Sequence, residues 1–272
     1  MDARTFLGIA PQNVALAWKL EVTPEVSTPG KFLYGGCGLG AALVALEQAS
    51  GRETAWATAQ YLSFAETGSS LDLEVTLAVS GKYVTQGRAI GRVQGREILT
   101  VNAALGHGDL EIEGTWVKPP VVPPPADCAP RRIPQIFGES VLNRVEVRVA
   151  SGRMMEDVDG TPGTGSSSFW ARLPGHFEPS AATLAIIGDY VASGINEPLG
   201  MRTMGRSLDN TIRVARLVPT EWILCDIRMH ALAHGIAQGL AHLWSEDGVL
   251  LATASQSLSV RLWPEGFLDL SR

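Results

Sequence analysis

The sequence predicts an α+β fold in which one unit, a long helix with an antiparallel sheet, occurs twice. Three observations support this prediction: weak similarity between the halves at an offset of about 150 residues, the same order of elements in each half, and a proline-rich segment between them. The offset places residues 71–75 on residues 222–226, and the turn and strand at 95–102 close to 247–254. Because order and strand length match, we expect both halves to share one fold.

The pattern of the first half is typical of one helix followed by a meander of strands. Residues 38–49 are apolar on all sides and open on glycines, which predicts a helix buried on most of its surface. Short β-type runs separated by glycine-containing turns then predict antiparallel strands at 56–64, 71–79, 84–93 and 98–105.

The second half repeats this order after a break in the chain. Lys118 begins a segment so rich in proline that neither a helix interior nor a sheet ladder can form, which favours an extended linker. After it we expect strands at 145–149 and 168–173, a helix at 180–192, and four further strands. The predicted organisation is an N-terminal domain at 1–115, a linker at 116–135 and a C-terminal domain at 136–272.

Composition narrows the class of protein. At 272 residues and 45% hydrophobic residues, the chain can bury a substantial core. Its net charge of −6 argues against a nucleic-acid surface, which needs clustered Lys and Arg, and its three widely spaced cysteines predict neither disulfides nor a zinc site. No apolar run reaches the roughly 18 residues of a membrane span, and the first residues do not begin a secretion signal, so we expect a cytoplasmic protein.

Several motifs in residues 207–262 carry a resemblance to a known family. They are Ser207-Leu208-Asp209, Glu221-Trp222-Ile223-Leu224, the turn at 247–252, and Ala254-Ser255-Gln256. In this order and spacing they resemble the C-terminal half of the acyl-CoA thioesterase II family, the double-hotdog thioesterases. Residues 33–36 and 60–64 are similar to the N-terminal half of that family, more weakly. The resemblance implies two helix-wrapped antiparallel sheets that form a pseudo-dimer, joined edge to edge, and further assembly into a homo-oligomer.

The resemblance also implies a reaction and its residues. The family hydrolyses fatty acyl-CoA thioesters with a water molecule held by an Asp, a Thr or Ser, and a Gln, without a covalent acyl-enzyme. Asp209 matches the aspartate and Gln256 the glutamine, a pairing in which a carboxylate accepts a proton and an amide orients the water. The hydroxyl position falls in residues 229–231, where His230 is the local substitute. The amide of Gly36, at the start of the first helix, is the expected donor to the thioester carbonyl.

Each of these residues also has a structural interpretation. Asp209 could cap a turn, Gly36 could simply permit close packing of the helix, and His230 could be a partly buried histidine. Asp189, inside the second helix, is expected to be a hydrogen-bonded core residue. Four arginines either meet the phosphates of CoA or form a solvated surface: Arg202, Arg206, Arg213 and Arg216.

Asymmetry between the halves predicts one functional site per chain. At the offset of about 150 residues, the first half has roughly Thr58 opposite Asp209, and Ala104 or Leu105 opposite Gln256. We expect acyl-CoA as the substrate, with no metal or other cofactor and no nucleic-acid partner. Two other functions remain open: a hotdog protein that binds acyl chains or acyl-CoA without hydrolysis, and an enoyl-CoA hydratase-like enzyme.

Overall fold

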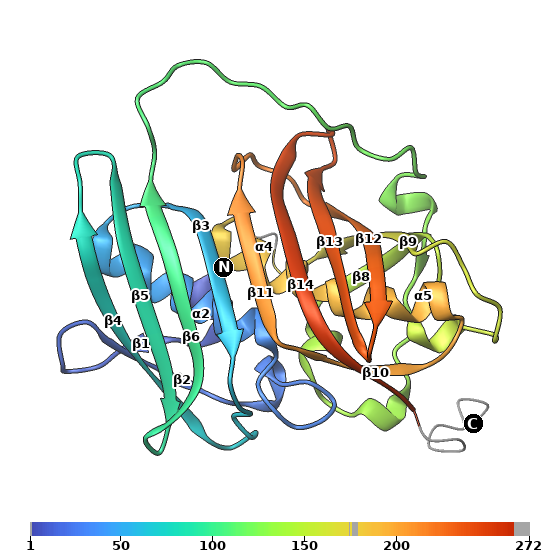
Figure 1. Cartoon of the computed structure of the whole chain (residues 1–272), viewed down its shortest axis with the longest axis horizontal. Coiled ribbons are helices and arrows are strands. Elements are labelled where there is room, and N and C mark those ends of the chain that lie inside the picture. Colours follow the sequence, from blue (N-terminus) through green and yellow to red (C-terminus); the bar gives the residue numbers. More distant parts are fainter. Residues whose placement is uncertain (1, 174, 176–178, 264–272) are drawn as a thin grey trace.

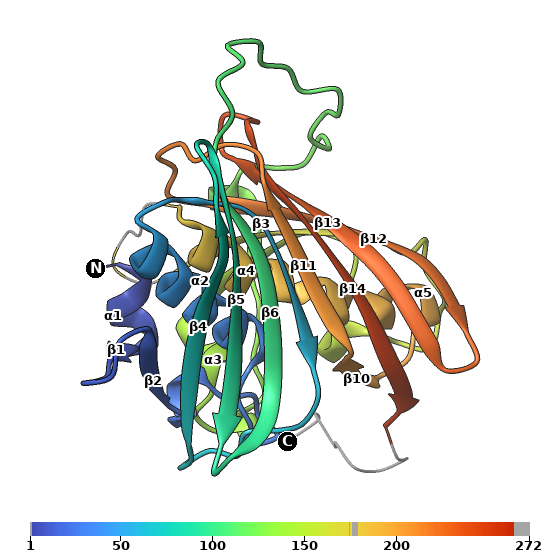
Figure 2. The same ribbon diagram turned by 60° about the vertical axis from the view of Figure 1, so that its left-hand side comes forward.

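A single antiparallel sheet runs through the whole molecule in the computed structural model, which describes residues 2–173, 175 and 179–263. Within these residues the sheet has 14 strands, and the helices lie against one of its faces (Figures 1 and 2). The strand order along the main path is β1-β2-β4-β5-β6-β3-β11-β14-β13-β12-β9-β8-β7, with β10 paired to β14.

The first half contains two α-helices and six strands. They are α1 (Ala3–Leu7), β1 (Ala10–Pro11), β2 (Ala17–Glu21), α2 (Gly35–Ser50), β3 (Thr54–Tyr61), β4 (Ser70–Ser80), β5 (Val84–Val93) and β6 (Arg96–Gly106). The helix and the four long strands lie where the sequence predicts them. The short strands β1 and β2 were not predicted; β2 is only five residues long and follows a turn.

The second half repeats the helix and the long strands, and five strands follow its helix where the sequence predicts four. Its α-helices are α3 (Val141–Arg144), α4 (Ala181–Gly188) and α5 (Asn196–Leu199). Its strands are β7 (Ala129–Pro130), β8 (Glu146–Ser151), β9 (Ser166–Arg172), β10 (Thr203–Ser207), β11 (Asp209–Val214), β12 (Ile223–Ala233), β13 (Ile236–Ser245) and β14 (Leu250–Leu262). Short 3-10 helices are η1 (Pro24–Val26), η2 (Pro125–Asp127), η3 (Gln135–Phe137), η4 (Met155–Asp157) and η5 (Asp189–Ile195). The predicted second helix is therefore α4 continued by the tighter η5.

The two halves join through β3 and β11, which pair antiparallel at the centre of the sheet. Thr58 pairs with Thr211 there, and their hydroxyl groups are 2.7 Å apart. Each of these strands would otherwise end its sheet with unpaired backbone groups, which invite aggregation. The predicted edge-to-edge double hotdog is thus confirmed.

Helices α2 and α4 pack closely against each other behind this junction (Figure 2). Glycines on α2 permit the approach: a Cβ at Gly36 would lie 2.8 Å from the backbone oxygen of Ala185. The side chains of both helices belong to one continuous apolar core shared by the two halves. The junction therefore lies within the core and is not a loose contact between separate domains.

The proline-rich segment arches from β6 over the sheet to the second half (Figure 1). Its later part packs on a separate cluster of buried residues that includes Trp170, Trp222 and Trp244. The indole of Trp170 donates a hydrogen bond of 2.9 Å to the backbone oxygen of Pro123. This end of the linker is thus docked on the second half. No helix in the described part of the chain is long and apolar enough to cross a membrane.

Candidate active site

A buried cluster of polar side chains surrounds Asp189, the first residue of η5. Its Oδ2 accepts a hydrogen bond of 2.7 Å from the backbone amide of Gly36, and its Oδ1 accepts one of 3.1 Å from Nδ2 of Asn210. The side-chain amide of Gln256 donates to the same Oδ1. The three side chains are between 1% and 5% exposed, so this is a polar site inside an apolar core.

The local structure explains why these groups meet. Side chains alternate between the two faces of a strand, and this alternation directs Asn210 on β11 and Gln256 on β14 toward the helices. Gln256 lies between Ala254 and Leu258 on the same face of β14, so it is the only long polar side chain in that row of three. In the sequence, Asp189 directly follows the end of α4. In space, its carboxylate lies against the first turn of α2, where free backbone amides favour an anion.

Burial sets the protonation of this carboxyl group. It raises the pKa of Asp189 to about 6, although the hydrogen bonds from Gly36, Gln256 and Asn210 act in the opposite direction. A carboxylate with a pKa just below neutral is ionised at pH 7 and still basic enough to accept a proton. The cluster therefore holds a group suited to general base catalysis.

Several polar atoms of the cluster have no hydrogen-bond partner among the described residues. They are Oδ1 of Asn210 and Oε1 of Gln256, and the Tyr61 hydroxyl lies near enough to the Asn210 side chain to lower the pKa of the phenol by a hydrogen bond. Buried polar atoms are rarely left unpaired in folded proteins, and those that are often mark a place for water or a ligand. The side-chain NH₂ groups of Asn210 and Gln256 donate to Asp189, and the side-chain oxygens of both residues remain available to accept from a water molecule.

Among the hydrogen bonds of the described residues, none joins the carboxylate of Asp209 to the side chain of Gln256. Oδ1 of Asp209 accepts a hydrogen bond of 2.7 Å from the backbone amide of Ser257, at the point where the ladder passes from β10 to β11. Its neighbour Asn210 is the residue that points toward the helices. The carboxylate that contacts Gln256 belongs instead to Asp189.

Gly36 and His230 also differ from the expected arrangement. The amide of Gly36 already donates to Asp189, so this bond occupies the donor that we expected to face a thioester carbonyl. His230 is exposed and lies at a β-bulge in β12, between Met229 and Ala231. It is Met229 that packs toward the core, next to Gly239, the partner of Gln256 on β13.

The sequence did not predict that Asp189 and Asn210 meet in one polar cluster. Asp189 was expected to be a hydrogen-bonded core residue, and it is one, but it also forms the centre of the cluster. A signal was present: an aspartate directly after an apolar helix has to find several donors, because a buried charge without partners is very costly. Asn210 gave no such signal, since an asparagine beside Asp209 is also common in turns.

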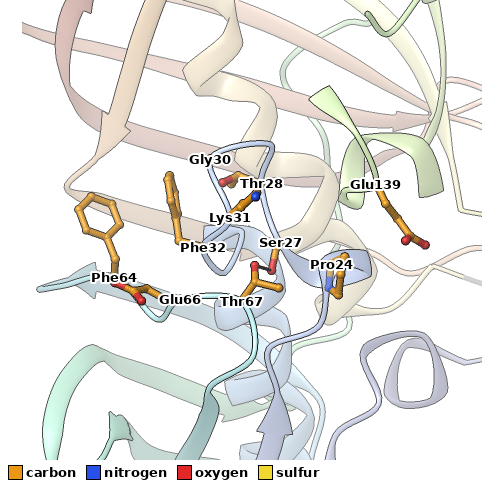
Figure 3. A pocket seen from close by; sticks show the side chains of 10 residues that line it. All are labelled: Pro24, Ser27, Thr28, Gly30, Lys31, Phe32, Phe64, Glu66, Thr67 and Glu139. Atoms are coloured by element: carbon orange, nitrogen blue, oxygen red, sulfur yellow. Dashed lines mark hydrogen bonds between the residues drawn. The ribbon is translucent and has the colours of Figure 1, made fainter. Parts of the chain in front are cut away.

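An open pocket of ≈ 650 Å³ lies outside this cluster, beside the loop that leads into α2 (Figure 3). Phe32 and Phe64 stand side by side at one end, with ring centroids 4.7 Å apart, and Glu139 lies at the other end. Lys31 is exposed on its rim, and the guanidinium of Arg206 lies over the Phe64 ring at 4.3 Å. Phe64 follows Tyr61 by three residues, so the pocket is close in the chain to the buried site.

The other three arginines are dispersed. Arg202 donates to the backbone oxygen of Glu156, Arg216 pairs with Glu113, and Arg213 is exposed on β11. They do not form a cluster with Arg206. Within the described residues, no group of three or more His, Cys, Asp or Glu side chains could hold a metal ion.

Comparison with known proteins gives the family. Residues 123–260 match the family model of the acyl-CoA thioesterase C-terminal domain. A solved structure of a candidate thioesterase from Novosphingobium aromaticivorans is 31% identical, with a TM-score of 0.83 over 92% of this chain and 97% of that chain. A protein of unknown function with a hot dog fold from Alicyclobacillus acidocaldarius is 19% identical, with a TM-score of 0.83 over 94% and 97%.

A further structural relative is an acyl-CoA thioesterase II from Mycobacterium marinum, 18% identical, with a TM-score of 0.75 over 97% of this chain and 100% of that chain. A search of curated proteins finds no significant match. The two helix-backed sheets joined edge to edge define a double hotdog protein. The chain belongs to the acyl-CoA thioesterase family. Thioester hydrolysis is therefore its class of reaction.

Proposed function

We propose that the protein hydrolyses fatty acyl-CoA thioesters to free CoA and fatty acid, with a water molecule activated by the buried carboxylate of Asp189. The observation that carries this proposal is the arrangement around that carboxylate. Three donors hold it between the two helices, while the oxygens of Asn210 and Gln256 lack partners. A water bound between a base and an amide oxygen would be both oriented and deprotonated in place.

The proposed step balances with this one base. A water bound at the Asp189 carboxylate loses a proton to it while the water oxygen forms a bond to the thioester carbon. The carbonyl electron pair moves onto oxygen, and it returns as the carbon–sulfur bond breaks. The proton on Asp189 then passes to the departing CoA thiolate, which leaves a carboxylic acid and free CoA thiol.

Gln256 keeps the role that the sequence suggests, but the geometry favours a different carboxylate. Asp209 remains a second candidate, since it matches the aspartate of the family motif. Its carboxylate, however, accepts a hydrogen bond from a backbone amide within the sheet. The residue that faces the helices is its neighbour, Asn210. We therefore infer a supporting role for Asp209 at the junction of β10 and β11.

The pocket beside α2 is our proposed position for the CoA portion of the substrate. Phe32 and Phe64 offer an aromatic surface to the adenine or the pantetheine arm, and Lys31 and Arg206 offer positive charge to phosphates. Phe64 is three residues beyond Tyr61, the last residue of β3. The thioester end of the substrate would therefore extend from the pocket along the end of β3 toward the buried cluster.

Release of CoA thiol from a series of acyl-CoA substrates, with and without single substitutions, tests the proposal. We expect the wild-type protein to release CoA and Asp189→Asn to lower kcat by about 10²- to 10⁴-fold, the usual contribution of a general base. Asp209→Asn is the matched control and should retain most of the activity. If Asp209→Asn is the inactive variant and Asp189→Asn is not, the water is held on the other carboxylate. If no substrate is hydrolysed although acyl-CoA binds, the protein is an acyl-CoA-binding member of the family.

A further inference from the structure

One row of residues on the helix-facing side of the sheet leads from the Asp189 cluster to an apolar side chain. Gln256 on β14 pairs with Gly239 on β13, and Gly239 pairs in turn with Met229 on β12. Residues that pair across antiparallel strands lie on the same face of the sheet. All three therefore face the helix layer, as the contact between Gln256 and Asp189 requires.

The side chain of Met229 fills the space at the end of this row. A Cβ at Gly239 would lie 2.7 Å from its Sδ and 3.1 Å from its Cε, so the thioether lies across this glycine. A Cβ at Gly194, in η5, would lie 3.2 Å from the same sulfur. One glycine belongs to the sheet and the other to the helix layer, so Met229 occupies room that neither of them fills.

Met229 also lies where two apolar clusters meet. It is partly buried and packs both against the main core and against a smaller cluster formed by Ile195, Ala237 and Leu258. Leu258 and Ala237 pair with each other and are two residues from Gln256 and Gly239 along the same strands, so they face the same way. The surroundings of the row beyond Gln256 are therefore apolar.

The two ends of an acyl-CoA need different surroundings. The pocket proposed for CoA includes Phe64, just beyond the end of β3, and the sheet order places β3 and β12 on opposite sides of β14 (Figure 1). An acyl chain that continues away from CoA past the Asp189 carboxylate thus passes Gly239 and reaches Met229. Methionine is unbranched and polarizable, so it can change conformation and pack against an apolar chain.

We propose that Met229 is a specificity-determining residue whose side chain sets the length of the acyl chain that the site accepts. This inference rests on the proposed thioesterase function and deepens it, because it places the acyl chain between η5 and β13. Short chains end before Met229, whereas longer chains have to displace it. The protein therefore favours acyl groups that end beside Gly239 over those that extend farther.

Hydrolysis of saturated acyl-CoAs from butanoyl to hexadecanoyl tests the assignment in Met229→Ala. The substitution removes the side chain beyond Cβ and leaves room for about three methylene groups. We expect the chain length of highest kcat/KM to increase by roughly two to four carbons, because each methylene in an apolar pocket changes kcat/KM by about tenfold or more. An unchanged chain-length profile in folded Met229→Ala would overturn the proposal.

Met154→Ala is the matched control. Met154 is also a buried methionine of the main core, and it precedes η4, outside the row of residues that leads from the cluster. Its loss leaves a similar gap, but the chain-length profile should stay that of wild type. If Met154→Ala moves the optimum as far as Met229→Ala does, the cause is a general loosening of the core and the proposal fails.

Two milder variants keep the test decisive if Met229→Ala does not fold. Met229→Val removes less of the side chain and suits a strand, so it should move the optimum in the same direction by a smaller step. Met229→Leu nearly conserves the volume and should keep the wild-type optimum. Equal profiles for folded Met229→Val and Met229→Leu would contradict the assignment.

Binding of S-alkyl-CoA thioethers separates this proposal from the proposed function, because thioethers are not hydrolysed. By calorimetry, Met229→Ala should tighten the binding of long thioethers relative to short ones by about tenfold or more, as burial of two or three further methylene groups does. Hydrolysis by wild type with profiles that ignore Met229 removes this proposal alone. A Met229-dependent binding profile without hydrolysis of any substrate removes the proposed function alone, and failure of both hydrolysis and binding removes both.

Discussion

Thr58 and Thr211 occupy equivalent places in the two halves, 153 residues apart, and their hydroxyl groups meet across the junction. Gly36 and Asp189 are separated by the same 153 residues and also contact each other. The offset holds in the sheets as well, because the pair Ala59–Val101 becomes Ile212–Ala254. The molecule thus carries two copies of one arrangement, related across β3 and β11.

The polar residues of the second half correspond to small residues in the first. At the offset of 153, Asp189, Asn210 and Gln256 replace Gly36, Ala57 and Ala103. The three small residues are not a failed site. Gly36 supplies a backbone amide and the space for the Asp189 carboxylate, which a side chain at this position would fill. The second half thus contributes polar side chains to the cluster, and the first half contributes space and a backbone donor, so the repeat forms one polar cluster and not two.

We expect the largest effect on turnover when a side chain is added at Gly36, in the first half. In Gly36→Ala the new Cβ would lie 2.8 Å from the oxygen of Ala185 and 2.9 Å from Cβ of Asp189, so backbone has to move. Overpacking of this kind costs about 1–3 kcal/mol, and misplacement of a catalytic group by about 1 Å costs about 10²-fold in rate. We expect a Tm lower by several degrees and kcat lower by about 10²-fold, measured by calorimetry and thiol release.

Gly40→Ala on the same helix is the control. Its Cβ would meet the oxygen of Ala182 at 3.2 Å and nothing else closer than 3.5 Å. A methyl group there also favours the helix by up to about 1 kcal/mol. Turnover should therefore stay near wild type. If both variants lose activity equally, the helix contact rather than the Asp189 site is responsible.

Replacing Gln256 with alanine, the residue at the equivalent position of the first half, tests whether Asp189 is the general base. With a pKa of about 6, Asp189 is protonated below this pH, so kcat/KM of wild type should fall as the pH drops through about 6. Gln256→Ala, which copies Ala103, removes a donor that lowers this pKa. We expect the acid limb to move to higher pH and kcat to fall by about tenfold at neutral pH. A profile that is unchanged by the substitution would mean that another group titrates.

The sequence predicted the fold well because its signals are local. Apolar periodicity, glycine turns and proline content mark the long helix and the eight long strands, and the motifs at 207–262 identify the family. The offset of about 150 residues was close to the true 153, yet three residues decide which side chains correspond. The equivalents of Asp209 and Gln256 are Trp56 and Ala103, not Thr58 and Ala104 or Leu105.

The candidate site could be predicted only in part. The sequence predicts a site at Gln256 because a long polar residue among small ones on a buried strand needs partners, and the structure gives it one in Asp189. The choice of Asp209 over Asn210 depends on which of two adjacent residues faces the helices, and a shift of one position along a strand reverses that direction. The approach of α2 to α4, which makes Asp189 and Gly36 neighbours, is a tertiary contact that no local pattern contains.

A smaller effect is expected at the pocket, where both halves contribute. Arg206 from the second half lies over Phe64 from the first, and its positive charge adds to that of Lys31 on the rim of the pocket. In Arg206→Glu we expect KM for acyl-CoA to rise roughly threefold to tenfold with kcat unchanged, because exposed ion pairs are worth up to about 1 kcal/mol and the charge is reversed. Arg213→Glu, on β11 and outside the lining of the pocket, should leave KM within about twofold. A fall in kcat without a change in KM would exclude phosphate binding as the role of Arg206.

The smallest effect should come from His230, the residue that the sequence suggests as a substitute for the hydroxyl of the family motif. The bulge between Met229 and Ala231 leaves His230 exposed, while Met229 packs against the core with β13 between it and the strand of Gln256. Surface substitutions of this kind are usually within about 0.5 kcal/mol, so His230→Ala should change kcat by less than about threefold at any pH. His234→Asn, at the exposed turn of the same hairpin, is a control that tolerates the left-handed backbone at that residue. A tenfold or greater loss in His230→Ala alone would place a catalytic group on the bulge, and the site would then extend across β12 beyond the Asp189 cluster.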